Sequence, residues 1–238
     1  MAEKFGGIEG RKRGGCVSQL RRRQNPKRYI DLGCNVAKRS LVPKKTRYLS
    51  EAIGAILGDG GLTSNQLHIT LNSDKDADYC VYLRNLLKRI FVLEVGIFKR
   101  KNAKAVVLTV SGVNFVNNLM ALGLKIGNKV KQQVEVPEWI TNNTDYAKAC
   151  LRGLMDTDGG VFLDKYVVNG KEYSYLKICF TNKSKPLITF VFNTLLFFGY
   201  NPKLYSDNKV WLYSYREVER YLKEIGSSNN RLNKWIKC

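Results

Sequence analysis

The sequence has few of the residues on which several enzyme classes depend. It has one histidine, His68, which excludes zinc sites built from several histidines. A Ser-His-Asp catalytic triad would have to use this histidine. Its six cysteines form no CxxC pair and lie mostly in apolar segments, which favours reduced thiols in a cytoplasmic (nucleoid) or organellar protein over a secreted one. No apolar run approaches the roughly 18 residues of a membrane-spanning helix, and no secretory signal is visible.

Acidic residues are also scarce relative to basic ones. The 238 residues include 40 lysines and arginines against 20 acids, which gives a net charge of +20. This charge indicates a polyanionic partner, and nucleic acid is expected rather than a membrane surface. The apolar content of 44% is sufficient for one large domain or two modest ones.

Two related stretches, AIGAILGDGG at 52–61 and LRGLMDTDGG at 151–160, are offset by 99 residues. Each is expected to form a helix that ends in an acid followed by two glycines. Small residues four apart, such as Gly54 and Gly58, share one helix face and would let two such helices pack directly together. Asp59 and Asp158 would then meet at the end of the pair, where divalent cations would relieve their repulsion.

These two motifs resemble those of single-chain LAGLIDADG homing endonucleases over roughly residues 48–226. The resemblance implies an α/β (α+β) fold in which an αββαββα unit occurs twice and two antiparallel sheets form a saddle. It implies an enzyme that cuts both strands of a long DNA site and leaves 3′ overhangs. Asp59 and Asp158 would bind two or three Mg²⁺ ions, with help from the main-chain carbonyls of Gly58 and Thr157.

Sites of this family often place an amide and a basic residue beside the metal ions. Asn72 and Thr181, which align at an offset of 109, are the candidates for the position of the amide. Arg216 is the candidate for the basic residue, although the first repeat then has no basic residue at the matching position. Lys183 or Lys75 could replace it.

Hydrophobic periodicity predicts the same order of elements in both repeats. In the first repeat these are a motif helix capped by Ser50, a strand at 66–72, a helix at 74–91, a hairpin at 95–110 and a helix at 114–122. In the second they are a motif helix capped by Asn143 or Thr144, strands at 161–168 and 171–181, a helix at 183–198, a hairpin around 207–208 and a helix at 215–225. The Asn169-Gly170 turn indicates a hairpin about ten residues longer than its counterpart.

The domain division follows from these elements. We expect a basic extension at 1–48, repeats at 49–126 and 144–226, a linker at 127–143 and a short basic tail at 227–238. Because the halves differ at most polar positions, a monomer and an asymmetric double-stranded DNA target are expected.

One face of each sheet is expected to contact DNA, because basic, aromatic and amide side chains alternate on it. The expected contacts are Gln66, His68, Thr70, Lys171, Tyr173, Tyr175, Lys177, Lys209, Trp211 and Tyr213. Arg100 and Lys104 are added from a hairpin for which the sequence does not determine which face of the sheet they lie on. For any one of them, a solvated strand face is the alternative.

The N-terminal 48 residues carry fourteen lysines and arginines against three acids. A basic arm on DNA is expected, in which Arg11, Lys12, Arg13, Arg21, Arg22 and Arg23 contact phosphates or a minor groove. A short helix at 16–24 and the apolar residues Tyr29, Ile30, Leu32 and Val36 suggest that the arm docks partly on the body. The alternative is a disordered, solubilising tail.

Three other functions fit the same residues. The protein could be a maturase that binds its host intron RNA, or a transcription regulator on a degenerate nuclease scaffold. It could also be the nuclease domain of an intein, but no splicing block is visible, so a free-standing, intron-encoded protein is expected.

Overall fold

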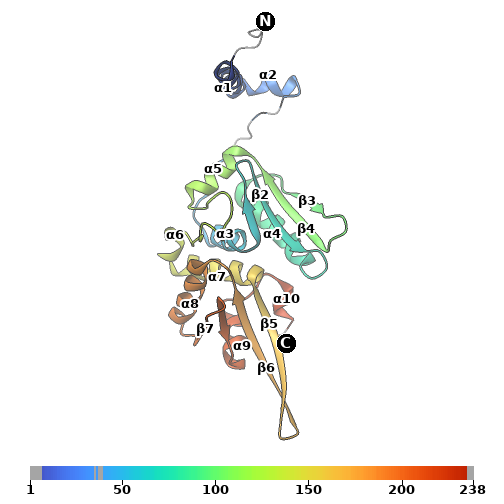
Figure 1. Cartoon of the computed structure of the whole chain (residues 1–238), viewed down its shortest axis with the longest axis vertical. Coiled ribbons are helices and arrows are strands. Elements are labelled where there is room, and N and C mark those ends of the chain that lie inside the picture. The colour runs from blue at the N-terminus through green and yellow to red at the C-terminus, as the bar shows by residue number, and fades with distance from the viewer. Residues whose placement is uncertain (1–6, 35, 37–39, 235–238) are drawn as a thin grey trace. The chain divides into compact units, whose positions relative to one another are not determined.

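The computed structural model describes residues 7–34, 36 and 40–234, which fall into two compact units divided after residue 39 (Figure 1). The ends of the expected extension and tail, 1–6 and 235–238, lie outside these residues. None of the helices in the described ranges is long and apolar enough to cross a membrane.

The N-terminal unit consists of α1 (Ile8–Gln24) and α2 (Pro26–Asp31). Helix α1 is eight residues longer at its start than the sequence predicts, and neither helix has a buried residue. Ile30 and Leu32 are 60% and 65% exposed, and docking of this unit on the body stays a prediction.

The larger unit contains the order αββαββα twice, which confirms the expected α/β (α+β) fold. The first repeat comprises α3 (Arg47–Asp59), β1 (Gly60–Leu62), β2 (Gln66–Asn72), α4 (Ala77–Phe91), β3 (Gly96–Lys99), β4 (Ala105–Ser111) and α5 (Val113–Ala121). The second comprises α7 (Thr144–Asp158), β5 (Gly159–Val168), β6 (Lys171–Thr181), α8 (Lys185–Phe197), β7 (Lys203–Tyr205), β8 (Lys209–Leu212) and α9 (Tyr215–Glu224). Two short helices, α6 (Glu138–Thr141) and α10 (Asn230–Asn233), lie outside this pattern.

Each repeat builds a four-stranded antiparallel sheet, in the orders β1-β2-β4-β3 and β5-β6-β8-β7. Side chains of β2 alternate between buried and half-buried positions, as expected of a strand with one face on the core. Gly60 pairs with Ile69 in the first sheet and Gly159 with Phe180 in the second. Strands β2 and β6 therefore correspond at an offset of 111 rather than 109.

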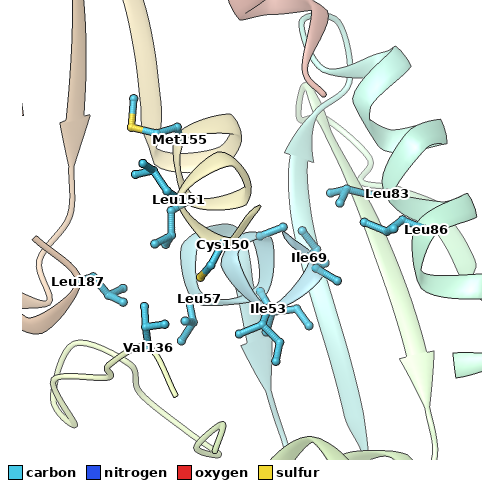
Figure 2. Packing of buried hydrophobic residues seen from close by; sticks show 14 of the residues in the cluster. Ile53, Leu57, Ile69, Leu83, Leu86, Val136, Cys150, Leu151, Met155 and Leu187 are labelled. Atoms are coloured by element: carbon cyan, nitrogen blue, oxygen red, sulfur yellow. The ribbon is translucent and has the colours of Figure 1, made fainter. Parts of the chain in front are cut away.

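The motif helices α3 and α7 pack directly against each other, as the small residues predict. A Cβ atom at Gly54 would overlap the carbonyl oxygen of Cys150, and one at Gly153 would overlap that of Glu51. These two contacts are related by the same offset of 99 residues, so the helices cross about a pseudo-two-fold axis. Figure 2 shows Leu57 of α3 in the core that surrounds this crossing, together with side chains of α7.

The N-cap of α3 differs from the prediction. The helix begins one turn earlier than Ser50, and the Thr46 hydroxyl caps it by accepting from the Leu49 amide at 3.2 Å. Ser50 is buried and donates to the Thr46 carbonyl oxygen. For α7 the prediction is confirmed, because the Asn143 side chain accepts from the Tyr146 amide.

The long hairpin of the second repeat is confirmed. Asn169 and Gly170 both have positive φ, +50° and +76°, which is the backbone of a type I′ turn. Strands β5 and β6 pair continuously from Gly159 with Phe180 to Val168 with Lys171, and they continue beyond the other strands of their sheet (Figure 1).

Residues 227–234 are packed into the larger unit rather than forming a tail. Glu51 and Asp156, which lie on the two motif helices, are almost fully buried and need polar partners. Ser228 supplies a hydroxyl to Glu51 at 2.7 Å and its amide to Asp156 at 2.9 Å. Asn229 donates to Asp76 and to the Asp156 carbonyl oxygen. The segment thus joins elements of both repeats.

Candidate active site

The two motif helices end at Asp59 and Asp158, and the chain then turns into β1 and β5. A Cβ atom at Gly58 would overlap the Thr157 side chain and lie 3.2 Å from Asp158 Oδ2. A larger residue at position 58 would therefore displace the Thr157 side chain, and this close approach brings the two acids together as the sequence predicts.

Both carboxylates lie in an unfavourable environment for negative charge. Burial raises the pKa of Asp59 to about 6, and the neighbouring charge of Asp158 contributes to this rise. Burial also raises the pKa of Asp158, although a hydrogen bond from Asn182 and the charge of Lys129 act in the opposite direction. An additional cation at this position would relieve the cost of holding two such acids ionised.

Lys129 is the basic residue at the end of α3, and the sequence alone did not identify it. Its ammonium donates to the carbonyl oxygens of Leu57 at 2.8 Å and of Gly58. These are the unpaired carbonyls at the negative end of the helix dipole. Burial lowers the pKa of Lys129, while Asp158 and Asp59 raise it.

Arg231 plays a corresponding part at the end of α7. Its guanidinium donates to the carbonyl oxygens of Asp156 and Gly159, both at 3.3 Å. It also pairs with Asp76 at 3.3 Å, and its positive charge lowers the pKa of Asp59. Each motif helix thus ends beside a cation from a segment that the sequence assigned to a linker or to a tail.

The amide beside Asp158 belongs to Asn182. Its Nδ2 donates to Asp158 Oδ2 at 2.7 Å, while its Oδ1 accepts from the Ser184 amide. Asn72 forms the same kind of turn in the first repeat, because its Oδ1 accepts from the amides of Asp74 and Lys75. The predicted partner of Asn72, Thr181, is one residue away, exposed, and lines a cleft beside the acid.

This cleft has a volume of about 310 Å³ and lies between the end of α3 and the start of α8. Lys129, Asp158, Asn182 and Lys183 are among its lining residues, so one of the two alternative basic residues is close to the acid. The other, Lys75, lies in the exposed turn before α4. Arg216 lies in the exposed first turn of α9 and does not line the cleft.

The residues present fit a hard divalent cation held by oxygen atoms. Over the described ranges no three His, Cys, Asp or Glu side chains cluster, so a metal would be held by Asp59 and Asp158 with main-chain oxygens. Carboxylate and carbonyl oxygens are the ligands that Mg²⁺ and Ca²⁺ prefer. The carbonyl of Gly58, one of the expected main-chain ligands, accepts from the Lys129 ammonium in this structure.

The outer face of the first sheet carries the predicted polar residues. Gln66, His68 and Thr70 are half-buried on β2, and Gln66 Nε2 donates to the Ser111 hydroxyl at 2.9 Å. His68 covers the backbone of Gly61 on the neighbouring strand.

The outer face of the second sheet is rich in aromatic rings. Trp211 stacks on Tyr213 with ring centroids 5.6 Å apart, and the Lys177 ammonium lies 5.0 Å from the Tyr213 ring. Lys177 also pairs with Asp164, and Lys209 pairs with Asp207. Cys179 shares this face but is buried, so the expected outward stripe is interrupted there.

The remaining predicted contacts lie on exposed segments. Arg100 is exposed at the β3–β4 turn, and Lys104 in the same turn forms a 3.0 Å ion pair with Asp74. On β6, Lys171, Tyr173 and Tyr175 are exposed on the projecting part of the hairpin. The six predicted basic residues of the N-terminal unit all lie on α1, where no residue is buried: Arg11, Lys12, Arg13, Arg21, Arg22 and Arg23.

Comparison with known proteins finds a family model that matches the second repeat. Residues 145–226 match a family model described as a LAGLIDADG-like domain. No curated protein matches the sequence.

Solved structures share the fold across most of the chain. The full-length DUF199/WhiA protein of Thermatoga maritima is 19% identical with a TM-score of 0.50, and the match covers 83% of this chain and 63% of that one. The I-LtrWI LAGLIDADG homing endonuclease, solved bound to target DNA, is 16% identical with a TM-score of 0.51, covering 79% and 87%. The meganuclease I-SmaMI, solved bound to uncleaveable DNA, is 12% identical with a TM-score of 0.53, covering 79% and 88%. At these identities the likeness establishes the fold.

Proposed function

We propose that this chain, a LAGLIDADG protein with both repeats in one polypeptide, is a site-specific endonuclease that hydrolyses one phosphodiester in each strand of a DNA duplex. The observation that carries the proposal is the pair of acids at the adjoining ends of α3 and α7, Asp59 and Asp158. The acids are desolvated and flanked by Lys129 and Arg231, as a site for phosphate and metal requires.

Bound divalent ions, for which we propose Mg²⁺, would polarise the scissile phosphate, activate a water molecule and stabilise the leaving 3′ oxygen. Asp59 and Asp158 would hold these ions, each serving one strand. The Asn182 amide fixes the orientation of the Asp158 carboxylate through its 2.7 Å hydrogen bond. The Lys129 ammonium is placed to offset negative charge on the phosphate.

The outer faces of the two sheets would contact the duplex. The net charge of +20 supports phosphate binding, and the polar and aromatic side chains of β2, β6 and β8 could reach base edges. These side chains differ between the repeats, for example His68 against Cys179 at offset 111, which supports an asymmetric target bound by a monomer.

The fold by itself does not decide between cutting and binding, because it is shared with DUF199/WhiA as well as with homing endonucleases. A maturase or a regulator on this scaffold would not need two desolvated acids at the helix ends. Retention of both acids with their flanking cations therefore favours cleavage.

The test is cleavage of a library of randomised duplexes by the purified protein with Mg²⁺, and in parallel with Ca²⁺ or EDTA. We expect one long asymmetric sequence to be cut with Mg²⁺ only. Asp59→Asn and Asp158→Asn should each retain binding and abolish or severely slow double-strand cleavage. Tight binding by the unaltered protein without any cut under Mg²⁺ would overturn the proposal, and intron RNA would then be the next ligand tested.

A further inference from the structure

The two repeats differ most in the length of their first hairpin. In the first repeat it runs from Gly60 to Asn72, 13 residues, and in the second from Gly159 to Thr181, 23 residues. The last pair of the short hairpin, Leu62 with Leu67, corresponds to Val161 with Ile178. Beyond that pair, the long hairpin continues for seven more cross-strand pairs, which we call the ribbon (162–168 and 171–177).

The ribbon extends the outer face of the second sheet. Strand β6 pairs with β8 only from Ile178 to Thr181, so no strand in the described part of the chain lies beside the ribbon. Its outer face is continuous with the face that carries Trp211, because Cys179 pairs with Trp211 and side chains alternate along β6. A ligand that lies along the outer face of the sheet would therefore also contact the ribbon.

Tyrosines form a row along this outer face. The Tyr166 ring stacks on Tyr173 and on Tyr175, with centroids 5.5 Å and 5.3 Å apart and interplanar angles of 17° and 7°. Such cross-strand ring pairs stiffen a two-stranded ribbon, which would otherwise be marginally stable. The three side chains are still 39–42% exposed, with Lys171 at the tip and Lys177 at the base of the same face.

The chemistry of the ribbon differs between its faces. The outer face offers phenol hydroxyls and the ammonium groups of Lys171 and Lys177, which can donate to phosphate and base-edge acceptors, and its one acid, Asp164, pairs with Lys177. The reverse face carries Leu163, Lys165 and Val167 on β5 and Glu172 and Ser174 on β6, so its one lysine is matched by one acid and it has no aromatic ring.

We propose that the ribbon lengthens the DNA interface of the second repeat, so that the target is asymmetric in length as well as in sequence. Five additional residues in each strand of the hairpin extend it by about 17 Å, which corresponds to about five base pairs. Measured outward from the cut, the arm bound by residues 144–226 is longer by this amount. The inference rests on the proposed DNA-binding function and specifies its substrate.

The test uses the duplex recovered from the randomised library, shortened one base pair at a time from either end. Binding is measured by fluorescence anisotropy in Ca²⁺, which prevents cleavage. The unaltered protein should require about five more base pairs on one arm than on the other. A shortened variant lacks 165–168 and 171–174, so the Asn169-Gly170 turn joins Asp164 to Tyr175, a pair of the same hydrogen-bonding type. It should require about four fewer base pairs on the long arm and the same number on the short arm.

Two point variants test the same inference if the shortened variant fails to fold. Tyr173→Thr removes an outer-face phenol and should weaken binding of the full-length duplex about tenfold, the effect of losing one hydrogen bond to a charged group, but not binding of a duplex that already lacks the outermost base pairs. Val167→Thr is the matched change on the reverse face and should leave both affinities unaltered.

Arms of equal length for the unaltered protein would overturn the inference. An unchanged requirement in the shortened variant, or equal losses for Tyr173→Thr and Val167→Thr, would overturn it as well. In each of these outcomes the protein still binds and cuts its site, so the proposed function stands. Absence of any site-specific cutting would instead remove the proposed function itself.

Discussion

Lys129 and Arg231 occupy matching positions behind the two motif helices. Lys129 lies six residues after Gly123 and Arg231 five residues after Gly226, the glycines that follow the last helix of each repeat. Each donates to main-chain oxygens at the end of the motif helix of its own repeat. The duplication therefore includes two basic residues outside the regular strands and the motif helices, and both contribute positive charge next to Asp59.

Lys129→Met should slow cleavage about 100-fold while DNA affinity changes little, because its ammonium would stabilise charge that develops on the phosphate. Lys129→Arg should retain part of the rate. Single-turnover cleavage of a supercoiled plasmid, which separates nicked from linear product, measures the effect on each strand. Lys131→Met, an exposed lysine of the same loop, is the control. A wild-type rate in Lys129→Met would make this lysine purely structural.

Divalent cations should stabilise the folded protein more at pH 8 than at pH 5. The pKa of Asp59 is about 6 in the folded protein and near 4 when unfolded, so the folded state binds more protons between these values. Without metal its contribution to stability therefore falls as pH rises from 4 to 6, and a bound cation offsets this loss above pH 6. Thermal melting in Ca²⁺ and in EDTA at both pH values gives the shifts. The double variant Asp59→Asn/Asp158→Asn should lose the cation effect, and an equal shift in that variant would place the cation elsewhere.

Gly54→Ala and Gly153→Ala should each destabilise the protein by about 1–3 kcal/mol or more, because the new methyl group meets a carbonyl oxygen of the opposite helix. Urea unfolding of the larger unit is the measurement. Gly14→Ala is the matched control, since it lies in α1, where an added methyl group would have no neighbouring atom within 4 Å. If the three variants unfold at the same urea concentration, the motif helices do not pack at the distance described.

Asn229→Ala should cost about 1–3 kcal/mol of stability, because it leaves the buried Asp76 carboxylate and the Asp156 carbonyl with one partner fewer. Asn230→Ala removes only an exposed 3.0 Å hydrogen bond to Asp78 and should change stability by less than about 0.5 kcal/mol. Chemical denaturation of the two variants side by side makes the comparison. Equal stabilities would show that residues 227–234 contribute little to the fold.

Deletion of residues 1–39 should weaken DNA binding and reduce its dependence on salt, because the segment carries eleven lysines and arginines against three acids. The deletion ends before Ser40, which bonds to Asn118, and before Thr46, the N-cap of α3. The slope of log affinity against log salt concentration is the readout, and its magnitude should fall by about 0.9 for each phosphate that the segment neutralises. An unchanged slope would mean that α1 does not touch the DNA.

The motif helices were predictable from sequence because their signals are local. The spacing of Gly54 and Gly153 dictates the close approach, and each Asp-Gly-Gly ends its helix at the acid. The Asn169-Gly170 turn likewise determined the length of its hairpin without reference to the rest of the chain.

The basic residues and the amide of the site depended on tertiary structure. Strands β2 and β6 correspond at an offset of 111, whereas the buried positions of α4 and α8, such as Leu83 and Val191, correspond at 108. Asn72 and Asn182 begin equivalent turns and correspond at 110, so the single offset of 109 used from sequence selected Thr181 instead of Asn182. Lys129 and Arg231 lie in segments without periodicity, so only the folded chain brings them to the helix ends.

The packing of residues 227–229 also governs the order of events during synthesis. The side chain of Ser228 bonds to Glu51, a residue made 177 positions earlier, and Ser227 and Ser228 are polar partners of the Asp156 carboxylate. At about 5–20 residues per second, Glu51 leaves the ribosome roughly 9–35 s before Ser228 does. The helix pair that holds the acids therefore acquires its full set of buried partners only when translation of both repeats is over, which delays assembly of the paired acids on the nascent chain.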